Sequence, residues 1–279
     1  MNSIEAVLES TEQLPPAPQV LSELLTVLSD LEADSSRAVD LITFDPGLTA
    51  KILQTSNSAM MGRGKPIDDV GEAVNRLGFQ TIYRIVASAS AGQILRPAKG
   101  NYGVDPDAFW KHSVMTAFAA QIIAHDSTED GNLLFTAGLL HDMGKVILAN
   151  AFKENYAAVI EKAGANSPAA TEMEKATFGL NHAEVGARLL ARWKFSAPII
   201  SSVWFHHDPA AAGPMQRFAA CVNLADTLAH SIELNTPIDE IGRPGHDVAL
   251  KTLQRNAEDL TGYQEQIREN MQFVEALCR

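Results

Sequence analysis

The chain has 279 residues, 46% of them hydrophobic and 20% charged, and its 22 basic and 34 acidic residues give a formal net charge of −12. This composition predicts a globular protein with a large apolar core and excludes a chain dominated by disorder. The negative charge repels a phosphate backbone, which makes nucleic acid a poor partner. Cys221 and Cys278 lie far apart without metal-type spacing, and no apolar run reaches membrane-spanning length. We therefore expect a cytoplasmic protein with no disulfide framework and no membrane association.

Apolar residues recur at helical spacing along most of the chain, so we predict an all-α fold. Residues 1–13 predict a short polar helix, which the prolines of segment 14–18 end. Further helices are expected from Gln19 to about residue 31, over 36–43, from Asp45 and Pro46 to about residue 57, over 69–77 and over 80–95, with a loop at 61–66. The last two could form a helix-turn-helix around Gly78. Because the second of these helices exposes only one basic residue, Arg84, which is too few to read a groove, we expect packing instead of DNA binding.

A polar break rich in glycine and proline at residues 96–106 divides the chain. We expect an N-terminal helical subdomain over residues 1–97 and a helical bundle over residues 106–279. The break is only about ten residues long, so the two halves should form one unit. In the second half, helices are predicted over 107–124, 133–148, 152–163, 170–178, 181–193, 198–207 and 217–234, followed by a charged helical pair over 247–279.

One predicted helix carries an unusual polar group. Residues 139–145 read Leu-Leu-His-Asp-Met-Gly-Lys within the apolar segment 133–148, whose helix should be buried. A buried helix seldom carries His, Asp and Lys so close together unless they are paired or bind a metal, because desolvating them unpaired is costly. This segment is therefore a candidate site.

More histidines and an aspartate lie on predicted core-facing helices. One such histidine is usually a satisfied core residue, but a set spread over successive helices is what an all-α metal site requires. Imidazole and carboxylate ligands together suit divalent Fe, Mn, Co, Ni or Zn. The candidates exceed the ligand count of one ion, whereas two ions bridged by Asp142 would use all of them, an arrangement that attacks phosphate esters. They are His112, His141, Asp142, His182, His206, His207 and Asp226.

The order of these residues resembles known families. His112, then His141 and Asp142, then Asp226 resembles the His…His-Asp…Asp signature of the HD superfamily of metal-dependent phosphohydrolases. Adding the other histidines makes the set similar to the binuclear HD-GYP subgroup, which hydrolyses cyclic di-GMP. The N-terminal half resembles HDOD domains, bacterial signalling relatives of the HD fold. That resemblance is carried by Gln-Leu-Pro-Pro-Ala-Pro at 13–18, Asp-Pro-Gly-Leu-Thr at 45–49, Ser-Asn-Ser-Ala at 56–59 and Ala-Val-Asn-Arg-Leu-Gly at 73–78, and it covers residues 10–210.

The sequence departs from both patterns. Many HDOD members have lost the metal ligands and are regarded as regulatory modules, whereas this chain keeps the set. The Gly-Tyr-Pro motif expected after the paired histidines is replaced by His-His-Asp-Pro-Ala-Ala-Ala-Gly at 206–213, which argues against hydrolysis of a cyclic dinucleotide. The resemblance implies that the seven candidates are metal ligands and that Lys145 contacts a substrate phosphate. The alternative for Lys145 is a surface ammonium that extends from its helix into solvent.

Two functions of different class remain open. The first is a non-catalytic HDOD signalling module with a binuclear site that serves as a scaffold for a protein partner. The second is a metal-dependent phosphohydrolase for a nucleotide or cyclic dinucleotide, with Asp142 and Lys145 as catalytic residues. The N-terminal half and the missing Gly-Tyr-Pro favour the first, which we expect, and the intact ligand set favours the second. The resemblance favours iron or manganese over zinc, cobalt or nickel, and it leaves a nucleotide or phosphate ligand open.

Overall fold

The computed structural model describes residues 19–29, 35–43, 45–58, 65–95, 105–164, 168–241 and 243–278. Within these ranges all regular structure is helical and there is no strand, which confirms the all-α fold. No helix in them is long and apolar enough to span a membrane. The predictions for residues 1–18, for most of the loop at 61–66 and for most of the break at 96–106 lie outside the described residues.

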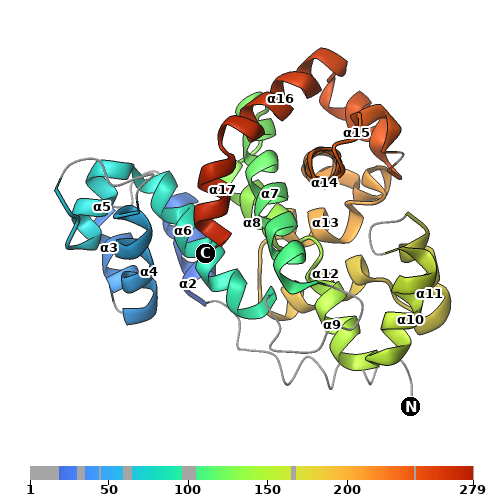
Figure 1. Ribbon diagram of the computed structural model, residues 1–279, viewed down its shortest axis with the longest axis horizontal. Coiled ribbons are helices and arrows are strands. Elements are labelled where there is room, and N and C mark those ends of the chain that lie inside the picture. The colour runs from blue at the N-terminus through green and yellow to red at the C-terminus, as the bar shows by residue number, and fades with distance from the viewer. Residues whose placement is uncertain are drawn as a thin grey trace.

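The N-terminal helices begin and end close to their predicted limits, because their signals are local. Asp45 caps the third of them by accepting hydrogen bonds from the amides of Gly47 and Leu48 at 2.9 and 3.1 Å. Gly78, with a φ of 79°, ends the fourth. In Figure 1, α3, α4 and α5 lie together at one side of the molecule, and α6 leads from them toward α7. The helices are α2 (Gln19–Ser29), α3 (Ser35–Thr43), α4 (Pro46–Ser56), α5 (Val70–Leu77) and α6 (Phe79–Leu95).

Helix α6 joins the N-terminal helices to the rest of the molecule. The Tyr83 hydroxyl hydrogen-bonds that of Thr136, and Arg84 Nε donates to Gln121 Oε1. The Arg84 guanidinium also lies 5.0 Å from the ring centroid of Phe118, within the range of a cation–π contact. Arg84 is therefore used in packing, as expected, and buried apolar residues from both halves belong to one contiguous core.

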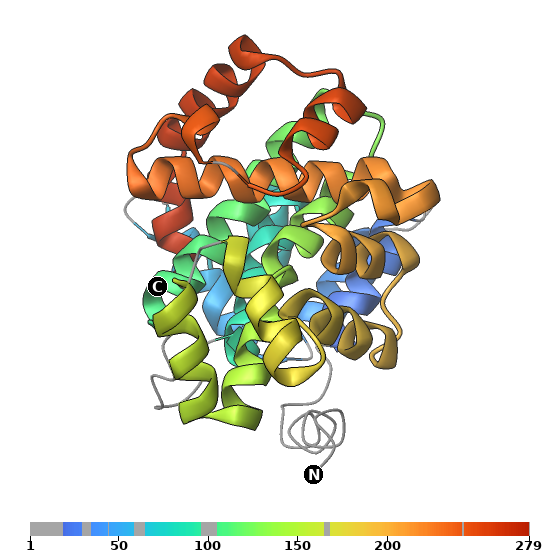
Figure 2. The ribbon, with the colours of Figure 1, turned by 90° about the vertical axis from the view of Figure 1, so that its right-hand side faces the viewer.

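The second half is a bundle crossed by one long helix. Helix α14 is seen end-on in Figure 1, while in Figure 2 it runs across the bundle. The helices are α7 (Pro106–His125), α8 (Gly131–Leu140), α9 (Met143–Phe152), α10 (Glu154–Ala163), α11 (Pro168–Phe178), α12 (His182–Arg192), α13 (Ala197–Phe205), α14 (Gln216–Leu234), α15 (His246–Leu253), α16 (Ala257–Glu269) and α17 (Met271–Cys278), with 3₁₀ turns η1 (Pro209–Met215) and η2 (Ile238–Glu240).

Two expectations about helix limits are wrong. The apolar segment 133–148 is not one helix, because a turn at His141 and Asp142 separates α8 from α9. There the His141 ring bonds the Gly138 carbonyl at 2.7 Å, and a side chain that competes for a backbone acceptor favours a helix end. The predicted C-terminal pair is three helices, since Gln254 ends α15 in a left-handed conformation and Asn256 forms the capping box of α16.

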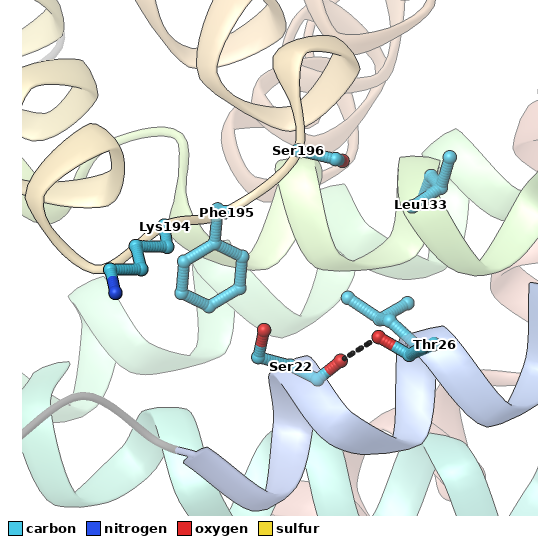
Figure 3. Close-up of a pocket in the computed structure, with 7 residues that line it drawn as sticks. Ser22, Thr26, Leu133, Lys194, Phe195 and Ser196 are labelled. Atoms are coloured by element: carbon cyan, nitrogen blue, oxygen red, sulfur yellow. Dashed lines mark hydrogen bonds between the residues drawn. The ribbon is translucent and has the colours of Figure 1, made fainter.

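A small cavity lies where α2 faces the second half. It has a volume of about 170 Å³ and separates α2 from the loop between α12 and α13 (Figure 3). None of the candidate site residues lines it. The lining residues are Ser22, Leu25, Thr26, Leu133, Lys194, Phe195 and Ser196.

Candidate metal centre

The fold brings all seven predicted ligands into one cluster. His112 lies on α7, and His141 and Asp142 occupy the turn between α8 and α9. His182 is the first residue of α12, the paired histidines follow α13, and Asp226 lies on α14. All but His207, which is partly exposed, are at most 6% exposed. Residues that lie singly or in pairs on successive helices thus come together in the interior, and their role as metal ligands stays a prediction.

Local features place His182 beside the turn at His141 and Asp142. The Asn181 side chain caps α12 by accepting from the Glu184 amide at 2.9 Å, so His182 occupies the first helical position. Helices α9 and α12 approach closely at Gly144, where a Cβ atom would lie 1.9 Å from the His182 carbonyl oxygen. The absence of a side chain at Gly144 is thus what lets the two helices meet beside the cluster.

The Asp142 carboxylate stands between two groups of imidazoles. Its Oδ2 lies 3.3 Å from His141 Nε2, while its Oδ1 lies 3.2 Å from His182 Nε2 and 3.8 Å from His206 Nε2. Lys145 Nζ is 2.6 Å from Oδ2 and is buried. The alternative of a surface ammonium is wrong, because Lys145 is buried and paired with a carboxylate, and its contact with a substrate phosphate stays a prediction.

The Asp226 carboxylate forms a second centre. Its Oδ1 lies 3.1 Å from His112 Nε2 and 3.8 Å from His141 Nε2, and its Oδ2 accepts the Arg243 guanidinium at 2.9 Å. His230, also on α14, places Nε2 3.3 Å from the same Oδ1. Both carboxylates therefore lie within 3.8 Å of the same atom, His141 Nε2.

In two of the rings, Nδ1 donates a hydrogen bond to a backbone carbonyl, while Nε2 faces the cluster. Nδ1 of His141 donates to the Gly138 carbonyl and Nδ1 of His206 to the Val203 carbonyl, both at 2.7 Å. Because a carbonyl only accepts, these Nδ1 atoms carry a proton. The form of each ring that binds a metal therefore has its lone pair on Nε2, which faces the cluster. Ligating histidines are oriented in this way in metal sites.

Two glutamates hold two further rings in the same orientation. His182 Nδ1 bonds Glu174 Oε2 at 2.7 Å, and His112 Nδ1 bonds Glu233 Oε2 at 3.1 Å. Glu174 is fully buried, and it also accepts hydrogen bonds from the His182 amide at 2.8 Å and from the Tyr156 hydroxyl at 3.0 Å. Such a carboxylate–histidine pair fixes the ring and raises the basicity of its inner nitrogen.

The inner atoms lack the partners that buried polar groups require. Among the described residues, Nε2 of His141, Nε2 of His206 and Oδ1 of Asp142 are buried without a hydrogen-bond partner. In the metal-binding form of the rings these atoms present lone pairs toward one another, and one bound cation would satisfy them together. The donor set of imidazole nitrogen and carboxylate oxygen fits a divalent transition metal.

Neighbouring charges keep both central carboxylates ionised. Burial alone would raise the pKa of Asp142, but His141 and Lys145 outweigh it and hold that pKa well below its usual range. Burial likewise acts to raise the pKa of Asp226, and the Arg243 guanidinium is the main group that lowers it instead. Both residues are anionic acceptors at neutral pH.

The imidazoles fall into two electrostatic classes. Burial, aided by neighbouring imidazoles, lowers the pKa of His206 to about 3, so its ring is a neutral donor. Burial also acts to lower the pKa of His112 and His182, yet Glu233 and Glu174, respectively, help to raise each to about 9. The carboxylates thus attract positive charge to both ends of the cluster, where a metal ion would supply it.

Several residues of the cluster were not anticipated from the sequence. His230 and Glu233 lie four and seven positions after Asp226, so helical periodicity on α14 could have placed them on the same face. Glu174 and Arg243 carry no comparable signal, because only the packing of α11 and of the loop before α15 brings them to the site.

A model of the HDOD domain family matches residues 14–209. An uncharacterized protein of Treponema pallidum is 26% identical over 242 residues, which is 85% of this chain and 46% of that protein. Ribonuclease Y of Geobacillus thermodenitrificans is 27% identical over 224 residues, 74% of this chain and 37% of that enzyme. The chain thus spans less than half the length of these curated relatives.

A solved structure resembles nearly the whole chain. It is a candidate phosphohydrolase from Shewanella amazonensis, 27% identical, with a TM-score of 0.72. The similarity covers 98% of this chain and 97% of that protein. The helical architecture of the described residues is therefore shared with a protein that is named as a phosphohydrolase.

Proposed function

This chain belongs to the HDOD domain family, whose model spans residues 14–209, and we propose that it is a regulatory protein of that family built around a binuclear transition-metal site. His112, His141, His182 and His206 carry the proposal, since each has Nδ1 bonded outward and Nε2 directed at Asp142 or Asp226. With Asp142 as the bridge, all seven predicted ligands are used. Iron or manganese is the expected metal.

The burial of the cluster favours a regulatory role. Six of the seven ligands are at most 6% exposed. Lys145 and Arg243, the cations nearest the carboxylates, are engaged by Asp142 and Asp226 and do not face an open surface. An ion held in such a site stabilises the fold that contains it, and it would give the chain a metal-loaded form for a signalling protein partner to recognise.

A metal-dependent phosphohydrolase is the second candidate, and one feature of the site favours it. His207 is partly exposed, so the side of the cluster formed by His182, His206 and His207 is the one nearest solvent. Bound ions would polarise a phosphoryl oxygen as Lewis acids. If they also neutralised Asp142 and Asp226, the Lys145 ammonium would be freed to hold a phosphate ester.

Metal analysis followed by an activity screen distinguishes the two functions. Protein purified without chelator, and then loaded with Mn²⁺ or Fe²⁺, is assayed for bound metal and for hydrolysis of bis(p-nitrophenyl) phosphate, nucleotides and cyclic dinucleotides. We expect the wild type to bind two ions per chain. We expect it to hydrolyse none of these substrates faster than Asp142→Asn does. Turnover lost in Asp142→Asn and in His206→Ala would establish the phosphohydrolase, whereas wild-type protein that binds no metal would overturn both candidates.

A further inference from the structure

His230 is a buried histidine of the cluster that lies outside the predicted ligand set. It is one helical turn beyond Asp226 on α14 and is 2% exposed. Its ring stacks on that of His112, with centroids 4.2 Å apart and an angle of 24° between the planes. The two imidazoles therefore lie side by side, although they come from different helices.

The stacked rings face the same two carboxylates. Their Nε2 atoms lie 3.1 Å (His112) and 3.3 Å (His230) from Asp226 Oδ1, and their Nδ1 atoms lie 3.1 and 3.3 Å from Glu233 Oε2. Carboxylates only accept hydrogen bonds, so protons alone could satisfy both ends only if both rings were imidazolium ions. Two parallel cations in contact would repel each other.

Both ring nitrogens of His230 are buried without a hydrogen bond in the part of the chain that the structure describes. Neither of its ring nitrogens has a hydrogen-bond partner of acceptable geometry among the described residues, although each lies 3.3 Å from a carboxylate oxygen. A buried imidazole left in this state costs free energy, and native proteins rarely tolerate it without a function. Its Nε2 is directed at the Asp226 oxygen that His112 and His141 also face.

We propose that His230 is a protein ligand, through Nε2, of the ion held by His112, His141 and Asp226, and that Glu233 orients His112 and His230. This inference rests on the metal site proposed above. The donor atoms of His112, Asp226 and His230 lie within 4.8 Å of one another, so one ion can contact all three. With Asp142 bridging the two ions, the remaining ligands are His112, His141, His230 and Asp226 for one ion, and His182, His206 and His207 for the other.

Cobalt binding to the full chain tests the assignment. Chelator-treated protein is titrated with Co²⁺, with occupancy followed by equilibrium dialysis and ligand geometry by visible absorption. Wild type should bind two ions. His230→Ala should keep one with wild-type affinity and bind the other at least about tenfold more weakly, with altered absorption, since even outer-shell partners of ligands contribute about 10–100-fold. Glu233→Gln should weaken the same ion, and His125→Ala, which removes an exposed histidine of α7, should match wild type.

A second substitution separates a ligand role from a packing role. His230→Gln retains most of the side-chain volume, so it should fold as wild type when chelated while still losing affinity for one ion. Two ions bound by His230→Ala and His230→Gln with wild-type affinity and absorption would overturn this assignment and leave the proposed function intact. A wild-type protein that binds no Co²⁺ would overturn both.

Discussion

At the scale of single residues, the proposed metal site depends on how each carboxylate is shared. Asp142 faces His141 through one oxygen and His182 and His206 through the other, whereas each imidazole offers one inner nitrogen. A bridging carboxylate serves both ions, and a terminal imidazole serves one. Replacing Asp142 should therefore remove more bound metal than replacing His182, even though both residues lie at the centre of the cluster.

We expect Asp142→Ala to remove both ions and His182→Ala to remove one, as measured by metal analysis after dialysis at equal free metal. Asp142→Asn should be intermediate, because it keeps one oxygen, and it avoids leaving Lys145 entirely without a partner. Asp107→Ala, an exposed aspartate of α7, should retain the wild-type content. Equal residual metal in Asp142→Ala and His182→Ala would show that Asp142 does not bridge.

At the scale of the helices, the closest approach near the site is that of α9 and α12. A Cβ atom at Gly144 would lie 1.9 Å from the His182 oxygen and 2.9 Å from the Gly186 nitrogen, both of them backbone atoms that cannot rotate away. The helices would have to separate, and because His182 is the first residue of α12, the ligand would move with its helix. Packing and ligand position are thus coupled through one glycine.

Gly144→Ala should lower the free energy of unfolding by about 1–3 kcal/mol or more, as overpacked interiors do, and should also weaken metal binding. Chemical denaturation of the chelated protein measures the first effect, and metal titration measures the second. Gly262→Ala is the matched control, because a Cβ there has no neighbour within 4 Å. Since alanine favours a helix interior by roughly 1 kcal/mol over glycine, that control should be as stable as wild type or more stable. Wild-type stability in both variants would contradict the close approach.

At the scale of the whole molecule, α6 connects the N-terminal helices to the metal-site bundle. Tyr83 and Arg84 bond to residues of α8 and α7, and the Arg84 guanidinium also lies 5.6 Å from the Phe273 ring centroid on α17. Buried apolar residues from both halves form one contiguous core. Free energy gained by metal binding at one side of this core should therefore stabilise the whole fold.

We expect one cooperative unfolding transition that moves to lower temperature when metal is removed. A ligand at 100 times its Kd stabilises a fold by about 2.7 kcal/mol, so the shift should be easily measured. Scanning calorimetry with and without chelator tests this, and the Asp142→Ala variant, whose site is already lost, should show no response to chelator. Two resolved transitions, only one of them sensitive to chelator, would show that the N-terminal helices unfold independently.

The helical fold, most helix limits and the central residues of the candidate site could be predicted from the sequence alone. Asp45, Gly78 and Asn181 act on residues within a turn of themselves, so their signals can be recognised without knowledge of the packing. The ligand set was recognisable because its residue types are uncommon on core-facing helices and because their order resembles a family signature. Each of these inferences depends on a few neighbouring residues or on order along the chain.

Only the tertiary structure decided which groups complete the site. The turn at His141 divides an apolar run that periodicity alone treats as one helix, since its side chain competes for a backbone acceptor. The pairing of Lys145 with Asp142, the support of His182 by Glu174 and the stacking of His230 on His112 are contacts between side chains in a desolvated interior. Burial makes such contacts necessary, and burial depends on which helices pack together, which no local pattern specifies.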